Sequence, residues 1–383
     1  MAKEVFITRT SSYFPNNPVG NEEMEDYLGL IGGKPSRVRS IILRQNGIKC
    51  RYYALDKKKN ITHTNAQLAA LAIKKMLSPE ELSMIQVLSC GTASPDQFLP
   101  SHASMVHGEA FNHPLEIFSF SGVCMTSIAS LKTAYMSILS DNSQNAICST
   151  SELISPILFS RQFEEEYSAK AKIEKNPLIA FEKDFLRFML SDGAACCLLE
   201  NSPHNDLNLR IDWIETISYA NNKPTCMYMG GDIDEQGVLI GWKHFNEEQR
   251  AKQSIWCVKQ NVKILNEHAI RLFVDAIVYA FQKHDIDPNS INYVIPHISS
   301  MFFYHKLDEE IQRRKIQLDE SRWFTNLTSV GNIGSVSIFA ALDELVKTKS
   351  LVDGEKILLL VPESGRFSYG VVLLTVKKTA NQK

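Results

Sequence analysis

The sequence lacks three features that would point to a membrane, a secreted protein or a nucleic-acid partner. In its 383 residues no apolar run comes close to the roughly 18 residues that span a membrane. The first ten residues, MAKEVFITRT, do not have the pattern of a signal peptide, so we expect a cytoplasmic protein that does not enter a membrane. A net charge of only −2 argues against a dedicated nucleic-acid binder.

Paired cysteines are also missing. The eight cysteines include no Cys-x-x-Cys pair, so we expect no metal site, no redox pair and no cofactor. Most lie in apolar surroundings, as Cys196 and Cys197 do, and we interpret them as buried free thiols in a reducing compartment. With 44% hydrophobic and 22% charged residues, the composition is typical of a globular protein with a full core.

One cysteine is singled out by its position. Cys124 lies where an extended apolar stretch ends and a helical pattern begins. A helix N-terminus offers unpaired N–H groups and about half a positive charge. These groups stabilise a thiolate, so the position predicts a lowered pKa and a nucleophile at Cys124. A buried core thiol is the alternative for any one of eight cysteines.

The second half of the chain repeats the pattern of the first. A strand, a strand-to-helix turn and another strand recur at offsets of 206, 208 and 211 residues, and so constant an offset indicates duplication. We expect an α/β fold of five layers, αβαβα, with an N-terminal half over 1–203 and a C-terminal half over 204–383. The matching segments are 85–90 with 291–296, 121–128 with 329–336, and 146–152 with 357–363.

The first half carries an insertion. The last strands of the two halves, 192–199 and 369–374, are related by an offset of only 177 residues. The extra residues fall between Glu152 and Asp192, and the segment 153–190 is rich in phenylalanine. We expect this aromatic segment to cap a pocket; a simple surface excursion is the alternative.

His297 and Asn332 lie near the duplicated positions. Each comes at the end of a predicted strand or in the turn after it, and in a duplicated α/β fold such ends face one crevice. There Cys124 would take an acyl group from a thioester. A neutral imidazole and an amide would donate hydrogen bonds to the oxygen of a second thioester as it becomes an enolate. The alternatives are a satisfied core histidine and a turn asparagine.

Six motifs in this order resemble the β-ketoacyl-ACP synthase III branch of the thiolase fold over nearly the whole chain. The resemblance implies that Cys124 accepts the acyl group and that His297 and Asn332 stabilise the enolate. It implies an oxyanion hole made by the N–H groups of Cys124 and Gly365. It also implies acyl carrier protein or coenzyme A thioesters as partners, and a homodimer with the strand before the nucleophile near the dyad. The motifs are Gly47–Arg51, Gly122–Cys124, Ser191–Ala194, Pro296-His297, Gly331-Asn332 and Gly365–Gly370.

The chain departs from the family pattern at positions that bear on the substrate. A Trp and an Arg that hold the adenine of coenzyme A in the family are here Ile41 and Gln45, which favours carrier-protein substrates. The small residues after the nucleophile are here Met125 and Thr126, and we expect these side chains to shape the substrate pocket.

The N-terminal third resembles a subgroup, the ketosynthase/cyclases of dialkylresorcinol and bacterial stilbene biosynthesis. The similarity runs through Pro15–Val19, Gly33–Arg37, Asn46–Ile48 and Arg51–Asp56. It implies joining of a β-ketoacyl thioester to an α,β-unsaturated acyl thioester, cinnamoyl-like or alkenoyl, with closure of a cyclohexanedione ring. An ordinary synthase III that uses malonyl-ACP is one alternative. A non-catalytic thiolase-fold partner subunit is an alternative of another class.

Three further features complete the predicted site. Glu152 follows a strand end and is a candidate base for ring closure, or a structural carboxylate bonded to backbone N–H groups. Arg366 is a candidate for holding a substrate carboxylate, or a partner in a structural salt bridge. A basic segment with no acid in it is a candidate docking site for an acidic carrier protein, or a solvated face. Its cations are Lys34, Arg37, Arg39, Arg44, Lys49 and Arg51.

Overall fold

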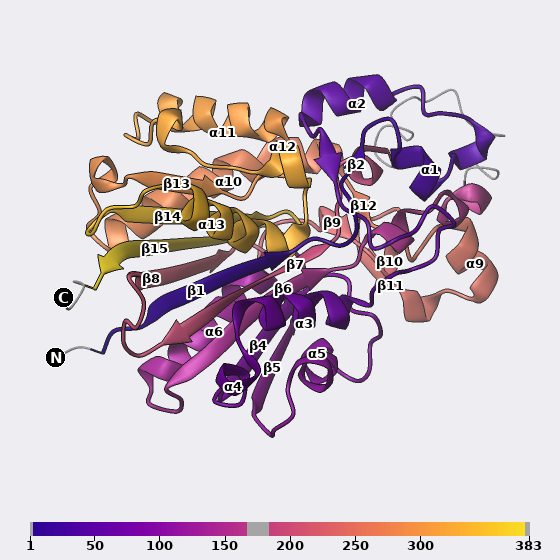
Figure 1. Ribbon diagram of the computed structural model, residues 1–383. Helices are drawn as coiled ribbons and strands as arrows, with labels where there is room; N and C mark the ends of the chain where they lie inside the picture. The colour runs from indigo at the N-terminus through magenta and orange to yellow at the C-terminus, as the bar shows by residue number, and fades with distance from the viewer. Residues whose placement is uncertain (1–2, 167–183, 380–383) are drawn as a thin grey trace.

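The computed structural model describes residues 3–166 and 184–379. Within these residues the strands that alternate with the main helices form one mixed sheet (Figure 1). In the order in which they lie side by side, its nine strands are β13 Tyr293–Pro296, β14 Lys356–Glu363, β15 Ser368–Lys378, β8 Leu207–Ser218, β1 Phe6–Tyr13, β7 Gly193–Glu200, β6 Asn145–Glu152, β4 Val87–Thr92 and β5 Glu116–Ser121.

The two halves of the sheet have the same strand order, read outward from the middle. The N-terminal half runs β1-β7-β6-β4-β5 and the C-terminal half runs β8-β15-β14-β13. Next to β13, in the position that matches β5, Trp323 forms a parallel bridge with Val294. The halves join where Phe6 and Ile7 of β1 pair with Arg210 and Leu209 of β8. Matching strands of the sequence repeat therefore occupy matching places in space.

Helices cover and separate the half-sheets, as the five-layer prediction requires. α6 (Thr126–Leu139) contacts β4, β6 and β8, and α13 (Ser337–Thr348) contacts β1, β7, β13 and β14, so both lie between the half-sheets. α3 (Asn65–Met76) and α5 (His102–Ala110) pack on the outside of the N-terminal half. α10 (Val262–Lys283) and α11 (Met301–Arg313) lie on the opposite side of the molecule (Figure 1).

The central helix α6 forms because its apolar residues recur at helical spacing. Ile128, Leu131 and Ile138 are buried, and they share one apolar cluster with Phe339 and Leu342 of α13. Burial of such a stripe on two sides stabilises the helix through packing more than through its own propensity. The cluster thus fixes the helix that begins next to Cys124.

Except for α4, which precedes the start of β4 at the other end, the shorter elements surround the end of the sheet where the duplicated turns lie (Figure 1). The helices are α1 Met24–Leu28, α2 Arg39–Asn46, α4 Pro79–Leu82, α9 Glu247–Lys252 and α12 Leu327–Val330, and the strands are β2 Val19–Gly20, β3 Cys50–Arg51, β9 Met227–Tyr228, β10 Gly231–Ile233, β11 Leu239–Gly241 and β12 Lys259–Gln260.

The described ends of the predicted insertion are buried against the rest of the chain. Phe159, Phe163, Phe185 and Phe188 are all buried. Arg187, also buried, donates hydrogen bonds to the carbonyls of Leu158 (2.9 Å) and Gly29 (2.8 Å). Two other predicted insertion aromatics, Tyr167 and Phe181, lie outside the described residues.

Candidate active site

Cys124 lies in the turn between β5 and α6, as the sequence predicts. The carbonyl of Cys124 accepts hydrogen bonds from the backbone N–H (3.2 Å) and the hydroxyl (2.7 Å) of Ser127. The hydroxyl of Thr126 donates to the carbonyl of Val123 (2.8 Å). These local bonds close the first turn of the helix and hold the thiol at its N-terminal end.

His297 is the direct partner of the thiol. It follows β13, and its backbone N–H donates to the carbonyl of Leu360 on β14 (2.7 Å). Its ring Nε2 lies 3.1 Å from Cys124 Sγ, which is hydrogen-bond distance for sulfur. Burial lowers the pKa of His297 to about 4, so the ring is neutral near pH 7. A neutral imidazole at this distance can accept the thiol proton.

The pKa of Cys124 shifts in the opposite direction from the one predicted. Burial raises the pKa of the thiol well above its usual range, and the carboxylates of Glu363 and Glu152 add to the shift. These effects outweigh the helix N-terminus, whose charge amounts to only about half a unit. The resting group is therefore a thiol, which would have to lose its proton, for example to His297, before it could act as a nucleophile.

Asn332 is held in place by the glycine before it. Gly331 has a φ of +76°, and a Cβ there would lie 2.9 Å from the Cβ of Ser191 and 3.1 Å from that of Arg51. The backbone N–H of Asn332 donates to Met189 (2.9 Å), and its side-chain oxygen accepts from the N–H of Gly334 (3.1 Å). With that oxygen engaged, the amide NH₂ remains as the donor toward the site.

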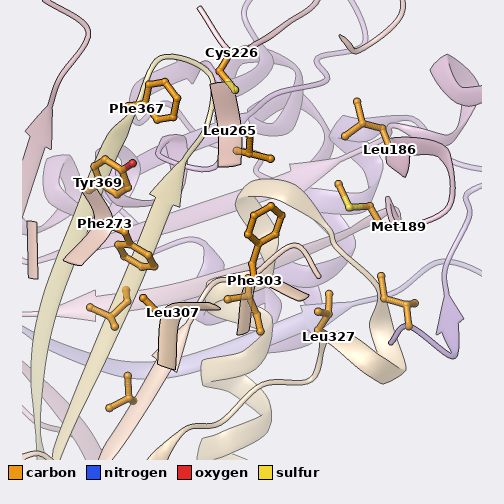
Figure 2. Packing of buried hydrophobic residues seen from close by; sticks show 14 of the residues in the cluster. Leu186, Met189, Cys226, Leu265, Phe273, Phe303, Leu307, Leu327, Phe367 and Tyr369 are labelled. Carbon is orange, nitrogen blue, oxygen red and sulfur yellow. The ribbon is translucent and has the colours of Figure 1, made fainter. Parts of the chain in front are cut away.

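Cys124, His297 and Asn332 line one cavity, which encloses about 1020 Å³ of space with its opening to solvent included. Its far walls are apolar and come from α10, α11, β15 and the end of the insertion. Figure 2 shows these walls, with Phe303 between Leu186 and Met189 on one side and Leu265 and Phe273 on the other. An apolar lining of this kind suits acyl chains.

Two carboxylates share the cavity with Cys124, the buried Glu152 and the half-buried Glu363. Glu152 ends β6 and Glu363 ends β14, so they occupy matching places in the two halves. Burial raises the pKa of both. Glu152 was predicted as a site residue, whereas Glu363 was not. The available signal was the sequence repeat, which pairs the two strand ends.

Gly365 lies beside the nucleophile turn. A Cβ on Gly365 would lie 3.3 Å from a methyl group of Val123, so a side chain there would press on the residue before Cys124. The carbonyl of Gly365 accepts the N–H groups of Cys226 (2.9 Å) and Met227 (3.3 Å), which fixes the loop after β14. The role of its N–H group in an oxyanion hole stays a prediction.

Three residues that the sequence predicts to contact the substrate, Met125, Thr126 and Arg366, do not line the cavity. The side chains of Met125 and Thr126 turn into the core and do not line the cavity, because β15 and β4 approach the start of α6 at Gly370 and Gly91. A Cβ on Gly370 would lie 3.1 Å from the sulfur of Met125. Arg366 is exposed, and its Nε donates to the carbonyl of Lys223 (2.9 Å), outside the cavity lining.

The predicted basic patch needs one correction. Arg51 is fully buried and donates to Asn21 Oδ1 (2.8 Å) and to the carbonyl of Phe188 (3.2 Å), so it cannot meet a carrier protein. Arg39 is half-buried and paired with Glu22 and Glu25, acids that the segment itself does not contain. The exposed cations are Lys34, Arg37, Arg44 and Lys49.

Comparison with known proteins shows which enzymes the chain resembles. The sequence profile of the 3-oxoacyl-[acyl-carrier-protein] synthase III C-terminal region matches residues 281–376. A β-ketoacyl-[acyl-carrier-protein] synthase III of Clostridium perfringens is 23% identical over 364 residues, which cover 94% of this chain and 96% of the relative. The chain is therefore similar to β-ketoacyl-ACP synthases III over nearly its whole length. It is an acyltransferase of the condensing type.

Solved structures show that the chain has the thiolase-like fold. AbyA1, a tetronic acid condensing enzyme, superimposes with a TM-score of 0.72 at 15% identity, covering 97% of this chain and 99% of its own. Xanthomonas campestris OleA with bound lauric acid and lauroyl-CoA superimposes with a TM-score of 0.71 at 17% identity, covering 98% and 100%. The predicted fold class is confirmed.

The described residues contain neither a helix able to span a membrane nor a cluster able to hold a metal ion. No helix in 3–166 or 184–379 combines the length and the apolar character that a bilayer span requires. In the same residues, no cluster of three or more His, Cys, Asp or Glu side chains is arranged to hold a metal ion.

Proposed function

We propose that this condensing acyltransferase is a ketosynthase/cyclase. It condenses a β-ketoacyl thioester with an α,β-unsaturated acyl thioester, cinnamoyl-like or alkenoyl, into a cyclohexanedione, in dialkylresorcinol or bacterial stilbene biosynthesis. The observation that carries the proposal is that the Cys124–His297 pair shares one apolar-walled cavity with two carboxylates, Glu152 and Glu363. Joining two acyl chains needs room for both and a base that creates a carbanion. A malonyl donor forms its carbanion by losing carbon dioxide and needs no such base.

The first half-reaction loads the nucleophile. Cys124 attacks the carbonyl of the unsaturated thioester while its proton passes to His297 Nε2, 3.1 Å away. The N–H groups of Cys124 and Gly365 stabilise the oxyanion that forms. His297 then returns the proton to the departing carrier thiol, which leaves an acyl group on Cys124 and a neutral imidazole.

The second half-reaction uses the neutral imidazole as a donor. A cavity base removes the acidic proton between the two carbonyls of the β-ketoacyl thioester. With its single ring proton now on Nε2, His297 donates a hydrogen bond to the enolate oxygen, and the amide NH₂ of Asn332 donates another. One carbanion attacks the acyl-Cys124 carbonyl and another adds to its double bond, so that two carbon–carbon bonds close the ring. Because burial keeps His297 neutral, the donor is present throughout the neutral pH range.

An ordinary 3-oxoacyl-ACP synthase III is the second candidate. It is favoured by the names of the curated relatives, of which that from Aquifex aeolicus is 23% identical over 369 residues. In that reaction the same Cys124, His297 and Asn332 serve a decarboxylative condensation with malonyl-ACP. The two candidates differ in whether carbon from malonyl enters the product.

Intact-mass spectrometry separates the two. The enzyme is mixed with a panel of acyl thioesters, and the mass added at Cys124, absent in Cys124→Ala, names the first substrate. A β-ketoacyl thioester is then offered with and without ¹³C-malonyl thioester. The proposal predicts an unlabelled cyclic product in both cases, whereas a linear labelled 3-oxoacyl product with no cyclic product refutes it. Loss of all activity in Cys124→Ala, purified alone, argues against a non-catalytic subunit.

We also propose that an acidic carrier protein docks at the exposed cations of the basic segment. α2 lies at the start of α11, where a Cβ on Gly47 would lie 2.6 Å from the Met301 side chain, close to Ile298 and Ser299 of the cavity lining. Charge reversal of the exposed cations should raise KM for carrier-bound substrates and leave KM for small thioesters unchanged. Equal effects on both would refute docking there. The four residues are Lys34, Arg37, Arg44 and Lys49.

A homodimer through β5 is the remaining proposal about partners. β5 is the last strand of the sheet, and its Phe118 and Phe120 are both half-buried. An open edge of this kind invites pairing with another strand, and a second copy supplies the same strand by twofold symmetry. Light scattering coupled to size-exclusion chromatography should give twice the chain mass of 43.3 kDa. A proline placed in β5 should reduce that mass toward the monomer.

A further inference from the structure

The two cavity carboxylates occupy matching places in the halves but have different surroundings. Only one of them, Glu363, has few enough hydrogen-bond donors around it to accept a further proton. We propose that Glu363 is the catalytic base of the condensation step and that Glu152 is a structural carboxylate. This inference rests on the proposed function, because only a donor that keeps its α-proton needs a base.

Glu152 is surrounded by donors on both carboxylate oxygens. Oε1 accepts from the hydroxyl of Ser335 (2.6 Å) and its backbone N–H (3.3 Å), and Oε2 accepts from the hydroxyl of Ser94 (2.6 Å). The N–H of Ala93 is 3.1 Å from both oxygens. Donors of this number occupy the lone pairs that would take a proton, although burial raises the pKa of Glu152 as it raises that of Glu363. Ser335 belongs to the C-terminal half, so Glu152 ties the two halves together.

Glu363 receives only backbone donors among the described residues. The N–H of Met125 donates to Oε2 (3.0 Å), and the N–H of Val123 also bonds to the carboxylate. These two residues flank Cys124 in the chain, so the carboxylate is anchored on both sides of the nucleophile. Its other oxygen, Oε1, lies 3.5 Å from the point where a Cβ on Gly365 would stand. The base therefore lies beside the predicted oxyanion hole, where the acyl carbonyl and the second substrate must meet.

The environment also brings Glu363 toward the range in which a carboxyl exchanges protons near neutral pH. Burial raises its pKa, and the two backbone donors lower it by less. No side-chain cation within the described residues pairs with it. A base is most effective when its pKa approaches the working pH, so this burial assists proton removal.

The proton and electrons balance through one cycle. The Glu363 carboxylate takes the proton from the carbon between the two carbonyls of the β-ketoacyl thioester, and the electrons of that C–H bond form the enolate. The enolate carbon bonds to the acyl carbonyl carbon, and the bond from that carbon to Cys124 sulfur breaks. The carboxyl group of Glu363 then returns its proton to the leaving thiolate. The step consumes no oxidant, reductant or further reactant.

The same carboxylate discriminates between donors. Its charge raises the pKa of Cys124, which shows that the field of Glu363 reaches the reacting atoms. A malonyl group would bring a second carboxylate into this field, whereas a β-ketoacyl group is neutral. Glu363 therefore favours the neutral donor twice, by activating it and by repelling its competitor.

The test compares two isosteric variants, Glu363→Gln and Glu152→Gln, with the wild type. Each enzyme is first acylated at Cys124 and checked by intact mass, so that folding and loading are verified before the second step. The acyl-enzyme is then mixed with a β-ketoacyl thioester, and condensation is followed in a single turnover. We expect Glu363→Gln to load normally and to lose about 10²–10⁴-fold in the condensation rate. Glu152→Gln should condense within about tenfold of the wild type.

A malonyl thioester as second donor separates failure of this inference from failure of the proposed function. Glu363→Gln should use malonyl at least as well as the wild type does, since no base is needed and the repelling charge is gone. A Glu363→Gln enzyme that still condenses the β-ketoacyl donor at the wild-type rate refutes the base while the ketosynthase/cyclase assignment stands. A wild type that condenses only malonyl refutes the assignment and the base together. A large loss in Glu152→Gln alone would move the base to Glu152.

Discussion

Gly331→Ala tests how the site depends on the backbone that holds Asn332. The substitution adds one methyl group at a residue with a φ of +76°, a conformation that costs an L-residue about 1–2 kcal/mol. The new Cβ would also lie 2.9 Å from the Cβ of Ser191 and 3.1 Å from that of Arg51. Both neighbours are buried, so neither can move freely. Overpacking of this kind adds about 1–3 kcal/mol.

The expected cost is therefore about 2–5 kcal/mol of unfolding free energy. With an unfolding entropy of about 2.1 cal/mol/K per residue, each kcal/mol lowers the Tm of a 383-residue chain by roughly 1.2 °C. Gly331→Ala should lower Tm by roughly 3–6 °C. Because Ser191 and Met189 are bonded to the backbone of Asn332, relief of the clash displaces its amide. A displacement of about 1 Å costs roughly 10²-fold in kcat.

Gly354→Ala is the matched control. Gly354 has a φ of +84°, and no atom lies within 4 Å of the added Cβ, so it carries the backbone strain without the clash. It should lower Tm by only roughly 1–2 °C and leave kcat unchanged. Thermal unfolding at one protein concentration and steady-state kinetics provide both measurements. Equal Tm losses in the two variants, or an unchanged kcat in Gly331→Ala, would refute the reasoning.

Three further predictions follow from burial. Alkylation of Cys124 by iodoacetamide should keep accelerating as the pH rises past 9, because burial and two carboxylates raise the pKa of the thiol; a plateau near pH 7 would show a stabilised thiolate instead. Burial raises the pKa of Asp192 to about 6 from 3.8. The folded protein therefore binds this proton more tightly than the unfolded chain, and stability falls as the pH rises from about 4 to 6, by about 3 kcal/mol. In urea unfolding, the margin of the wild type over Asp192→Asn should shrink over that range, and a growing margin would contradict the sign. Phe303→Ala removes a ring from the middle of the cavity; it should cost about 3 kcal/mol and lengthen the longest acyl chain that loads onto Cys124, as read by intact mass. An unchanged chain-length limit would place the end of the acyl site elsewhere.

Much of the fold could be read from local patterns. Each element can be predicted from the spacing of its own residues. Examples are the short β-branched strands, the turns rich in small residues, and the helical stripe of Ile128, Leu131 and Ile138. The near-constant repeat offset then predicts which elements match, and the mirrored strand order places matching strands in matching positions. The repeat does not predict that the half-sheets join at β1 and β8, because that depends on which sheet edges meet in space.

The site shows where local reading stops. Cys124, His297 and Asn332 follow from motifs at strand ends, and the structure brings all three to one cavity. Met125 and Thr126 follow the nucleophile directly, yet in the first turn of a helix neighbouring side chains point to different faces, and these two face β15 and β4. Arg51 belongs to a basic run in the sequence, but β3 carries it beneath Phe188 and Asn21.

Charge and burial account for the remaining differences between the sequence predictions and the structure. By itself the sequence determined the candidate nucleophile, its candidate partner histidine, the duplicated α/β architecture and the resemblance to synthase III, because each rests on residue type and spacing along the chain. Only the tertiary structure decided the protonation of the site. The pKa of Cys124 depends on desolvation and on Glu152 and Glu363, which come from strands 28 and 239 residues further along. Electrostatic interactions depend on distance in space and on the exclusion of water, and neither can be predicted from the order of residues alone.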